Sequence, residues 1–148
     1  MNKWIWLCLL VVPLLWLTGC GGSNDLNLGE GTGVISADDF DPFGSLGGPV
    51  NLRYFTVPQT GTYQVILSSG PGQPSLPNPW IQLLAGHVGA NNIEFLGAYA
   101  NGNGVLAQNT GSNIAQITIT ASAGEEFTLV FSSSSGGTGA YSWRVTQL

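Results

Sequence analysis

Residues 124–145, GEEFTLVFSSSSGGTGAYSWRV, decide the fold class of this chain. Large apolar residues occupy every second position on both sides of a Ser/Gly turn: Phe127, Leu129 and Phe131 before it, and Tyr141, Trp143 and Val145 after it. A period of two predicts half-buried β-strands, because successive side chains of a strand point to opposite faces. We therefore expect Tyr141, Trp143 and Val145 to point into a core and Arg144 to point into solvent.

The same period continues towards the N-terminus of the chain. Short alternating runs are bounded by Gly, Pro, Asn or Ser at near-regular intervals, and apolar residues at helical spacing are missing after Cys20. The pattern predicts about eight strands, at residues 53–57, 63–67, 80–84, 93–99, 105–108, 114–121, 127–132 and 141–146. Strands of this length and spacing are typical of an antiparallel sandwich or barrel, and we expect one such all-β domain over residues 34–148.

The composition excludes two classes of protein. Charged residues make up 7% of the 148 residues and hydrophobic residues 43%, which excludes a disordered acidic chain. The formal net charge is −5, and the three basic residues form no cluster. Without a basic patch the chain cannot neutralise a phosphate backbone, so we expect no nucleic-acid partner.

The first twenty residues predict export and a lipid anchor. Lys3 precedes the apolar run WIWLCLLVVPLLWL of residues 4–17, which is shorter than the roughly 20 residues that span a bilayer. The run ends in Leu17-Thr18-Gly19-Cys20, which resembles a bacterial lipobox. This resemblance implies a signal peptide over residues 1–19 and diacylglyceryl modification of Cys20, with the membrane as partner. An uncleaved signal anchor is the alternative, and the short apolar run disfavours it.

A Gly- and Asn-rich stretch follows Cys20. Residues 21–33, GGSNDLNLGEGTG, predict a flexible tether over residues 20–33. Gly21 directly after the lipidated residue is similar to the sorting pattern of outer-membrane lipoproteins. Cys8 lies inside the expected signal peptide, so the mature domain has no cysteine pair and must be stabilised by its own core.

Four segments resemble the bacterial pre-peptidase C-terminal domain family. They are RYFTVP (53–58), GTYQVIL (61–67), GEEFTLVF (124–131) and GAYSWRV (139–145), and the resemblance extends over about residues 51–147. It implies a jelly-roll-like β-sandwich of about eight strands, with the last two segments as a closing hairpin. It also implies a non-catalytic accessory role; several such modules bind polymers or calcium. PNPWI (77–81) stands where the family usually has an acidic element, so no calcium ligand is transferred.

The chain offers little material for catalysis. Its one histidine, His87, lies in a Gly-rich loop, and no Gly-x-Ser-x-Gly motif is present. Glu94 and Glu126 are the two strand carboxylates that a glycosidase-like pair would need, on opposite halves of the chain. We therefore predict that the protein is not an enzyme, with an unrecognised hydrolase as the remaining alternative.

One acidic cluster is a candidate metal site. Asp38, Asp39 and Asp41 lie within four residues beside a Pro-containing turn, and carboxylate oxygens are ligands that Ca²⁺ prefers. The spacing lacks the Gly and the distal Glu of an EF-hand loop. A solvated turn is the competing interpretation.

Two aromatic residues are candidate ligand contacts. Trp80 follows a Pro-rich loop, and Tyr99 lies in a Gly- and Asn-rich region. Both could stack on a sugar ring, but packing in the core is the stronger interpretation. The expected function is thus a non-enzymatic, lipid-anchored cell-envelope β-sandwich with a binding or structural accessory role and an envelope protein or polymer as partner. The alternative is a carbohydrate- or peptide-polymer-binding module that uses exposed aromatics near Trp80.

Overall fold

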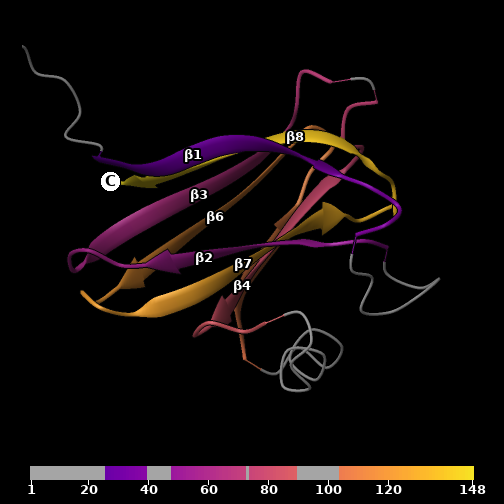
Figure 1. Cartoon of the computed structure of the whole chain (residues 1–148). Coiled ribbons are helices and arrows are strands. Elements are labelled where there is room, and N and C mark those ends of the chain that lie inside the picture. Colours follow the sequence, from indigo (N-terminus) through magenta and orange to yellow (C-terminus); the bar gives the residue numbers. More distant parts are fainter. Residues whose placement is uncertain (1–25, 40–47, 73, 90–103) are drawn as a thin grey trace, which may run out of the picture.

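A computed structural model describes residues 26–39, 48–72, 74–89 and 104–148 (Figure 1). These residues form eight strands and no helix. The strands are β1 (Leu26–Ile35), β2 (Asn51–Thr56), β3 (Gly61–Ser69), β4 (Pro79–Ala85), β5 (Val105–Thr110), β6 (Ile114–Ala121), β7 (Glu126–Ser133) and β8 (Gly139–Gln147). Within these ranges there is accordingly no helix of the length and apolarity needed to cross a membrane.

The strands form two four-stranded layers. Sheet A has the order β1-β8-β3-β6 and sheet B the order β2-β7-β4-β5, and all pairs are antiparallel (Figure 1). The first strand pairs with the last, the second with the seventh, the third with the sixth and the fourth with the fifth. One long hairpin rolled into two layers produces this pairing, which is that of an eight-stranded jelly roll. The predicted all-β antiparallel sandwich is confirmed.

Alternating side chains from both sheets fill the core between them. Tyr63, Val65 and Leu67 on β3 are at most 1% exposed, and Phe131 on the opposite sheet is fully buried. The rings of Phe131 and Tyr141 meet edge to face across the layers, with centroids 5.6 Å apart. Burying side chains of this size stabilises the fold by about 1.5–3 kcal/mol each. The core therefore carries the stability of a domain without disulfides.

Strand β7 departs from simple alternation because it is buried on both faces. Its side chains from Phe127 to Ser133 are all buried, including those that point away from the core. On that outer face Val130 forms a second apolar cluster with Val50 and Leu84. Four partly buried residues pack against this cluster: Leu52, Trp80, Val88 and Val105. The outer face of sheet B is thus apolar at its centre.

The prediction of a flexible tether over residues 20–33 is wrong for residues 26–33, which form most of strand β1. Residues 26–33 belong to β1, which pairs with β8 from Leu26 opposite Gln147 to Ile35 opposite Gly139. Glycines hid this strand, since Gly is depleted in strands and leaves no apolar alternation to detect. Here they make room for rings: a Cβ on Gly31 would lie 3.0 Å from Trp143 Nε1. The folded domain therefore begins before residue 34.

The last two strands do not form the expected hairpin. Strand β7 lies in sheet B and β8 in sheet A, and residues 134–138 carry the chain from one sheet to the other. Phe131 and Trp143 consequently face each other across the core, with ring centroids 6.1 Å apart. Burial agrees with the expected alternation of β8: Tyr141 and Val145 are buried, Trp143 is half-buried at the margin and Arg144 is exposed.

Some expectations concern residues outside the described ranges. These are the signal peptide over residues 1–19, lipidation at Cys20 and the strand at residues 93–99. The eight strands of the described ranges include β1, which the sequence analysis did not predict.

Candidate functional site

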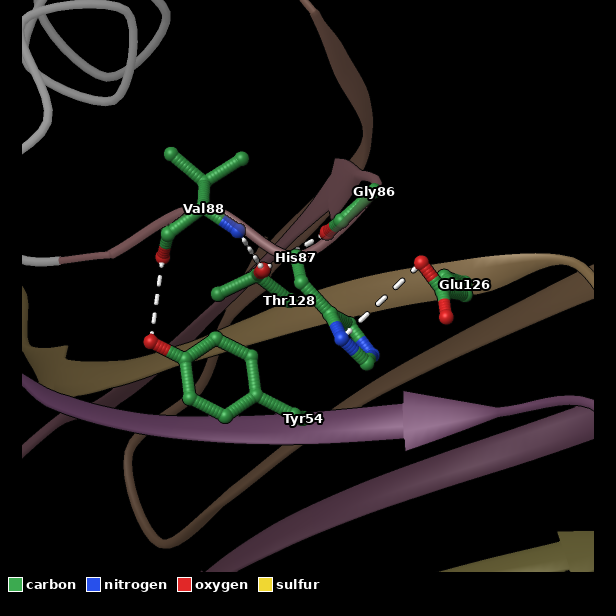
Figure 2. A network of polar contacts seen from close by, with 6 residues as sticks. All are labelled: Tyr54, Gly86, His87, Val88, Glu126 and Thr128. Atoms are coloured by element: carbon green, nitrogen blue, oxygen red, sulfur yellow. Dashed lines mark hydrogen bonds and ion pairs between the residues drawn. The ribbon is translucent and has the colours of Figure 1, made fainter.

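A polar network joins the segment after β4 to the outer face of sheet B (Figure 2). The chain turns at Gly86, which has a φ of +74°, a conformation that favours glycine. The Gly86 N–H donates to the carbonyl of Glu126 at 2.7 Å. These features direct residues 86–89 back over β7.

Thr128 on β7 is the centre of this network. Its Oγ1 accepts a hydrogen bond from the Val88 N–H at 2.8 Å and donates one to the Gly86 carbonyl at 2.7 Å. Thr128 is fully buried, and its two partners, at Gly86 and Val88, are half-buried. One hydroxyl therefore satisfies two backbone groups of the loop.

His87 lies between an aromatic ring and a carboxylate. Its ring centroid is 5.1 Å from that of Tyr54, and its Nδ1 is 3.9 Å from Oε2 of Glu126 (Figure 2). The side chains of His87 and Glu126 are 41% and 52% exposed. Tyr54 donates its hydroxyl proton to the Val88 carbonyl at 3.4 Å. The three side chains thus cover the loop on its solvent side.

This arrangement holds a loop more readily than it performs acid–base chemistry. A catalytic histidine needs an oriented carboxylate and a nucleophile. Glu126 could serve as the carboxylate, but Thr128 already uses its hydroxyl as both donor and acceptor. Among the residues described, no hydroxyl is hydrogen-bonded to the His87 ring. Glu94, the other carboxylate considered from the sequence, lies outside the described ranges.

The candidate ligand residue Trp80 is half-buried and packs against the second apolar cluster. It lies on the outer face of sheet B, opposite Ser132 on β7 and Thr110 on β5. Tyr99 lies outside the described residues. The structure thus packs Trp80 on the outer face of sheet B, outside the main core in which the sequence analysis favoured placing it.

The acidic cluster forms a capped turn in its described part. Asp39 Oδ2 accepts a hydrogen bond from the Ser36 N–H at 2.8 Å, and the Asp39 N–H donates to the Ser36 carbonyl at 3.1 Å. Asp38 is exposed, and Asp41 is outside the described residues. In the ranges that the structure covers, no three His, Cys, Asp or Glu side chains lie close enough together to hold a metal ion.

Arg53 and Tyr141 form a polar contact inside the sandwich that sequence analysis did not single out. Arg53 Nη2 donates to the Tyr141 hydroxyl at 3.2 Å, and Nη1 donates to the Leu52 carbonyl at 2.9 Å. Burial raises the pKa of Tyr141, while the charge of Arg53 opposes that rise and the charge of Asp39 adds to it. The sequence does contain a sign of this contact. Arg53 lies at the same alternate positions as Phe55 and Val57, and a period of two therefore places it on the inner face of the strand.

Similarity to known proteins is found among solved structures. No family model and no curated protein matches the chain. Among solved structures, it is similar to the pre-peptidase C-terminal domain of a collagenase from Bacillus anthracis, at 14% sequence identity and a TM-score of 0.47. The match covers 81% of this chain and 89% of that domain.

Proposed function

We propose that the protein is a non-enzymatic β-sandwich of the bacterial cell envelope, anchored by a lipid on Cys20 and exposed to either side of the outer membrane. The observation that carries the proposal is the lipobox-like Leu17-Thr18-Gly19-Cys20, placed directly before a chain that folds into one jelly roll. Two acyl chains hold a protein on a membrane stably, whereas a single chain binds marginally. The folded domain would then work by binding, at its loops and strand edges.

The state of His87 supports a role without catalysis. Its ring contacts Tyr54 and Glu126, and the nearby hydroxyl of Thr128 is committed to two backbone groups. The same contacts account for the polar residues of this site through loop anchoring alone. The accessory role implied by the family resemblance points in the same direction.

The anchor is tested by labelling cells with palmitate and fractionating them. Wild type should incorporate the label and partition with membranes, whereas Cys20→Ser should not incorporate it. Cys8→Ser is the matched control, because it removes the other cysteine and should leave labelling unchanged. Unlabelled wild-type protein, or labelled Cys20→Ser, would contradict the proposal.

A second candidate is a polymer-binding module that uses Trp80. The observation that favours it is the position of the half-buried Trp80 ring on the outer face of sheet B, where part of it reaches solvent. Binding to insoluble peptidoglycan or cellulose should then fall with Trp80→Ala and persist with Trp143→Ala, its matched control in the opposite sheet, at a temperature at which circular dichroism shows both variants to be folded. Equal retention of both variants would remove Trp80 from consideration.

A further inference from the structure

A groove of about 600 Å³ opens between the two sheets along the edge strands β5 and β6. Its floor consists of apolar side chains that also belong to the main core, Leu83, Ala107, Ile119 and Phe127. Its rim carries Leu106, Thr118, Thr120, Glu125 and Glu126. Ala85 completes the lining, and we call the space that these ten residues line the β5–β6 groove.

The two edge strands are tied together at one end and separate at the other. At the tied end Asn109 Nδ2 on β5 donates to the Gln116 carbonyl on β6 at 2.7 Å. The groove begins two residues further along each strand, at Ala107 and Thr118. Between these points and the turn before β7, apolar core side chains border a space that the two sheets do not close.

The backbone of β6 faces this opening. The Thr62 carbonyl accepts a hydrogen bond from the Leu148 N–H at 2.9 Å, so the backbone N–H and C=O of Thr62 point towards β8. Thr120 lies directly opposite Thr62 and therefore directs its own N–H and C=O away from β3. The backbone groups of Thr118, two residues earlier, have the same orientation. The hydrogen bond from Asn109 to the Gln116 carbonyl agrees with it, because that carbonyl also points away from β3. The free edge of sheet A thus presents, beside the groove, backbone N–H and C=O groups that are not paired with another strand.

This edge lacks the usual features that prevent strand addition. Strand β6 reads IAQITITA and contains no charged residue and no proline, the common means of protecting an edge. On the facing strand, the register shift between Leu83 and Leu84 leaves Leu106 as a bulged residue. A bulge redirects its side chain, and Leu106 is 53% exposed on the groove rim. The opening is therefore apolar on its floor and on one rim.

The charge of the groove is negative at the end nearest β7. Glu125 and Glu126 both line it, and none of its lining residues is Lys or Arg. Glu125 accepts a hydrogen bond from the Ser122 N–H at 2.9 Å, and Glu126 is half exposed with His87 3.9 Å away. A cation on an incoming chain would find two carboxylates there.

From these observations we propose that the β5–β6 groove takes an extended segment of a partner protein, which adds to β6 as a further strand of sheet A. Aliphatic residues at alternate positions of the segment fill the floor between the sheets, and a Lys or Arg at one end pairs with Glu125 and Glu126. Main-chain hydrogen bonds would supply affinity, and the floor and the carboxylates would supply specificity. This inference deepens the binding role under "Proposed function" and rests on it.

The test uses the full-length chain in nonionic detergent and a fluorescein-labelled peptide, KVTVTVK, followed by fluorescence anisotropy. We expect saturable binding that weakens as salt is raised. The peptide EVTVTVE keeps the aliphatic residues and reverses the charge, and it should not bind. KVTVTVK with every internal amide N-methylated keeps the side chains and loses the donors, and it should not bind either.

Protein variants locate the site. Glu125→Gln with Glu126→Gln should weaken KVTVTVK binding by about three- to tenfold, the range expected for two exposed ion pairs. Glu30→Gln, a carboxylate on β1, is the matched control and should leave binding unchanged. Leu106→Ser should weaken binding, whereas Ile114→Ser, an equally exposed aliphatic residue at the β5–β6 turn end, should not. Circular dichroism on every variant confirms that it is folded.

Three results would overturn the inference. Equal binding of KVTVTVK and EVTVTVE would contradict the pairing with Glu125 and Glu126. Equal binding of KVTVTVK and its N-methylated form would contradict strand addition. A dimer by sedimentation that Leu106→Ser converts to a monomer would make a second copy of the chain the occupant. Failure of peptide binding in a protein that still incorporates palmitate at Cys20 would refute this site and leave the envelope anchor standing.

Discussion

Arg53 on β2 donates a hydrogen bond to the hydroxyl of Tyr141 on β8 at 3.2 Å, and this bond joins the two sheets of the sandwich. Tyr141 is fully buried, so its hydroxyl has to find its partners within the protein. Arg53 is half-buried and also donates to the Leu52 carbonyl. The pair places a positive charge at the boundary of an otherwise apolar core.

Tyr141→Phe should therefore lower the free energy of unfolding by about 1–2 kcal/mol, because a half-buried guanidinium loses an acceptor. Tyr54→Phe is the matched control, since Tyr54 is 54% exposed and its bond to Val88 lies at the surface. Urea denaturation of both variants measures the difference. Equal stability of the two variants would show that the inter-sheet bond contributes nothing.

The same tyrosine predicts a loss of stability in alkaline solution. Burial raises the pKa of Tyr141 above its ordinary value of 10.0, so the folded state holds this proton more tightly than the unfolded chain does. This contribution is complete below pH 10.0 and declines as the pH rises from there through the folded-state pKa. The free energy of unfolding, measured from about pH 8 to about pH 11, should fall less steeply in Tyr141→Phe than in wild type.

Gly33→Ala should destabilise the domain. A Cβ at Gly33 would lie 2.5 Å from the Tyr141 hydroxyl oxygen and 2.6 Å from Cζ, a contact that a buried ring cannot avoid by a small shift. We expect a cost of about 1–3 kcal/mol from overpacking. Gly29→Ala is the control, because its Cβ would meet Trp143 at 3.3 Å, at the margin of the core. A thermal melt in which Gly33→Ala matches or exceeds wild type would contradict the packing of β1 on β8.

Trp143→Ala should cost about 2–4 kcal/mol, somewhat less than removal of a fully buried Trp, because the ring is half-buried against Phe131. Arg144→Ala, on the exposed face of the same strand, should change stability by less than about 0.5 kcal/mol. Chemical denaturation distinguishes the two. A stable Trp143→Ala protein that loses a binding activity would instead make Trp143 a ligand contact.

Thr128→Val keeps the shape of the side chain and removes its hydroxyl. The Val88 N–H and the Gly86 carbonyl would both lose their partner, so we expect a loss of about 2 kcal/mol and faster amide exchange at Val88. Thr118→Val, on the exposed side of β6, is the control and should change little. Unchanged exchange at Val88 would mean that the loop over β7 does not depend on Thr128.

A shortened chain that starts at residue 24 should fold cooperatively, and its melting should be insensitive to reductant because it contains no cysteine. A chain that starts at residue 36 lacks β1 and should melt at a clearly lower temperature, since β1 covers the edge of β8. Equal melting temperatures would restore the tether interpretation of residues 26–33.

The local pattern of the sequence contained the strands β2 to β8. Phe127, Leu129 and Phe131, for instance, alternate regularly, and a period of two has a direct physical cause in the geometry of a strand. Strand β1 was not recognisable in this way. Its glycines carry no side-chain signal, and their reason for being there is the space that Tyr141 and Trp143 occupy on a strand more than a hundred positions away.

The candidate sites differ in the same way, since one consists of contiguous residues and the others join distant segments. The lipobox-like residues up to Cys20 are contiguous, so sequence alone suffices to propose a lipid anchor. The contact of His87 with Glu126 and Tyr54 brings three segments together, and the β5–β6 groove needs the end of β6 to lie across from a bulge at Leu106. No local pattern specifies these neighbours.

By itself, the sequence determined that this chain forms short antiparallel strands, that its core is built without disulfides, and which faces of most strands are buried. Alternation, turn residues and cysteine positions are local properties, and they act before any two distant strands meet. The tertiary structure alone decided that β7 and β8 face each other across the core, that β1 completes sheet A, and that β5 and β6 leave a groove between them. Those outcomes depend on pairings between distant segments, which are selected by the joint burial of both sheets.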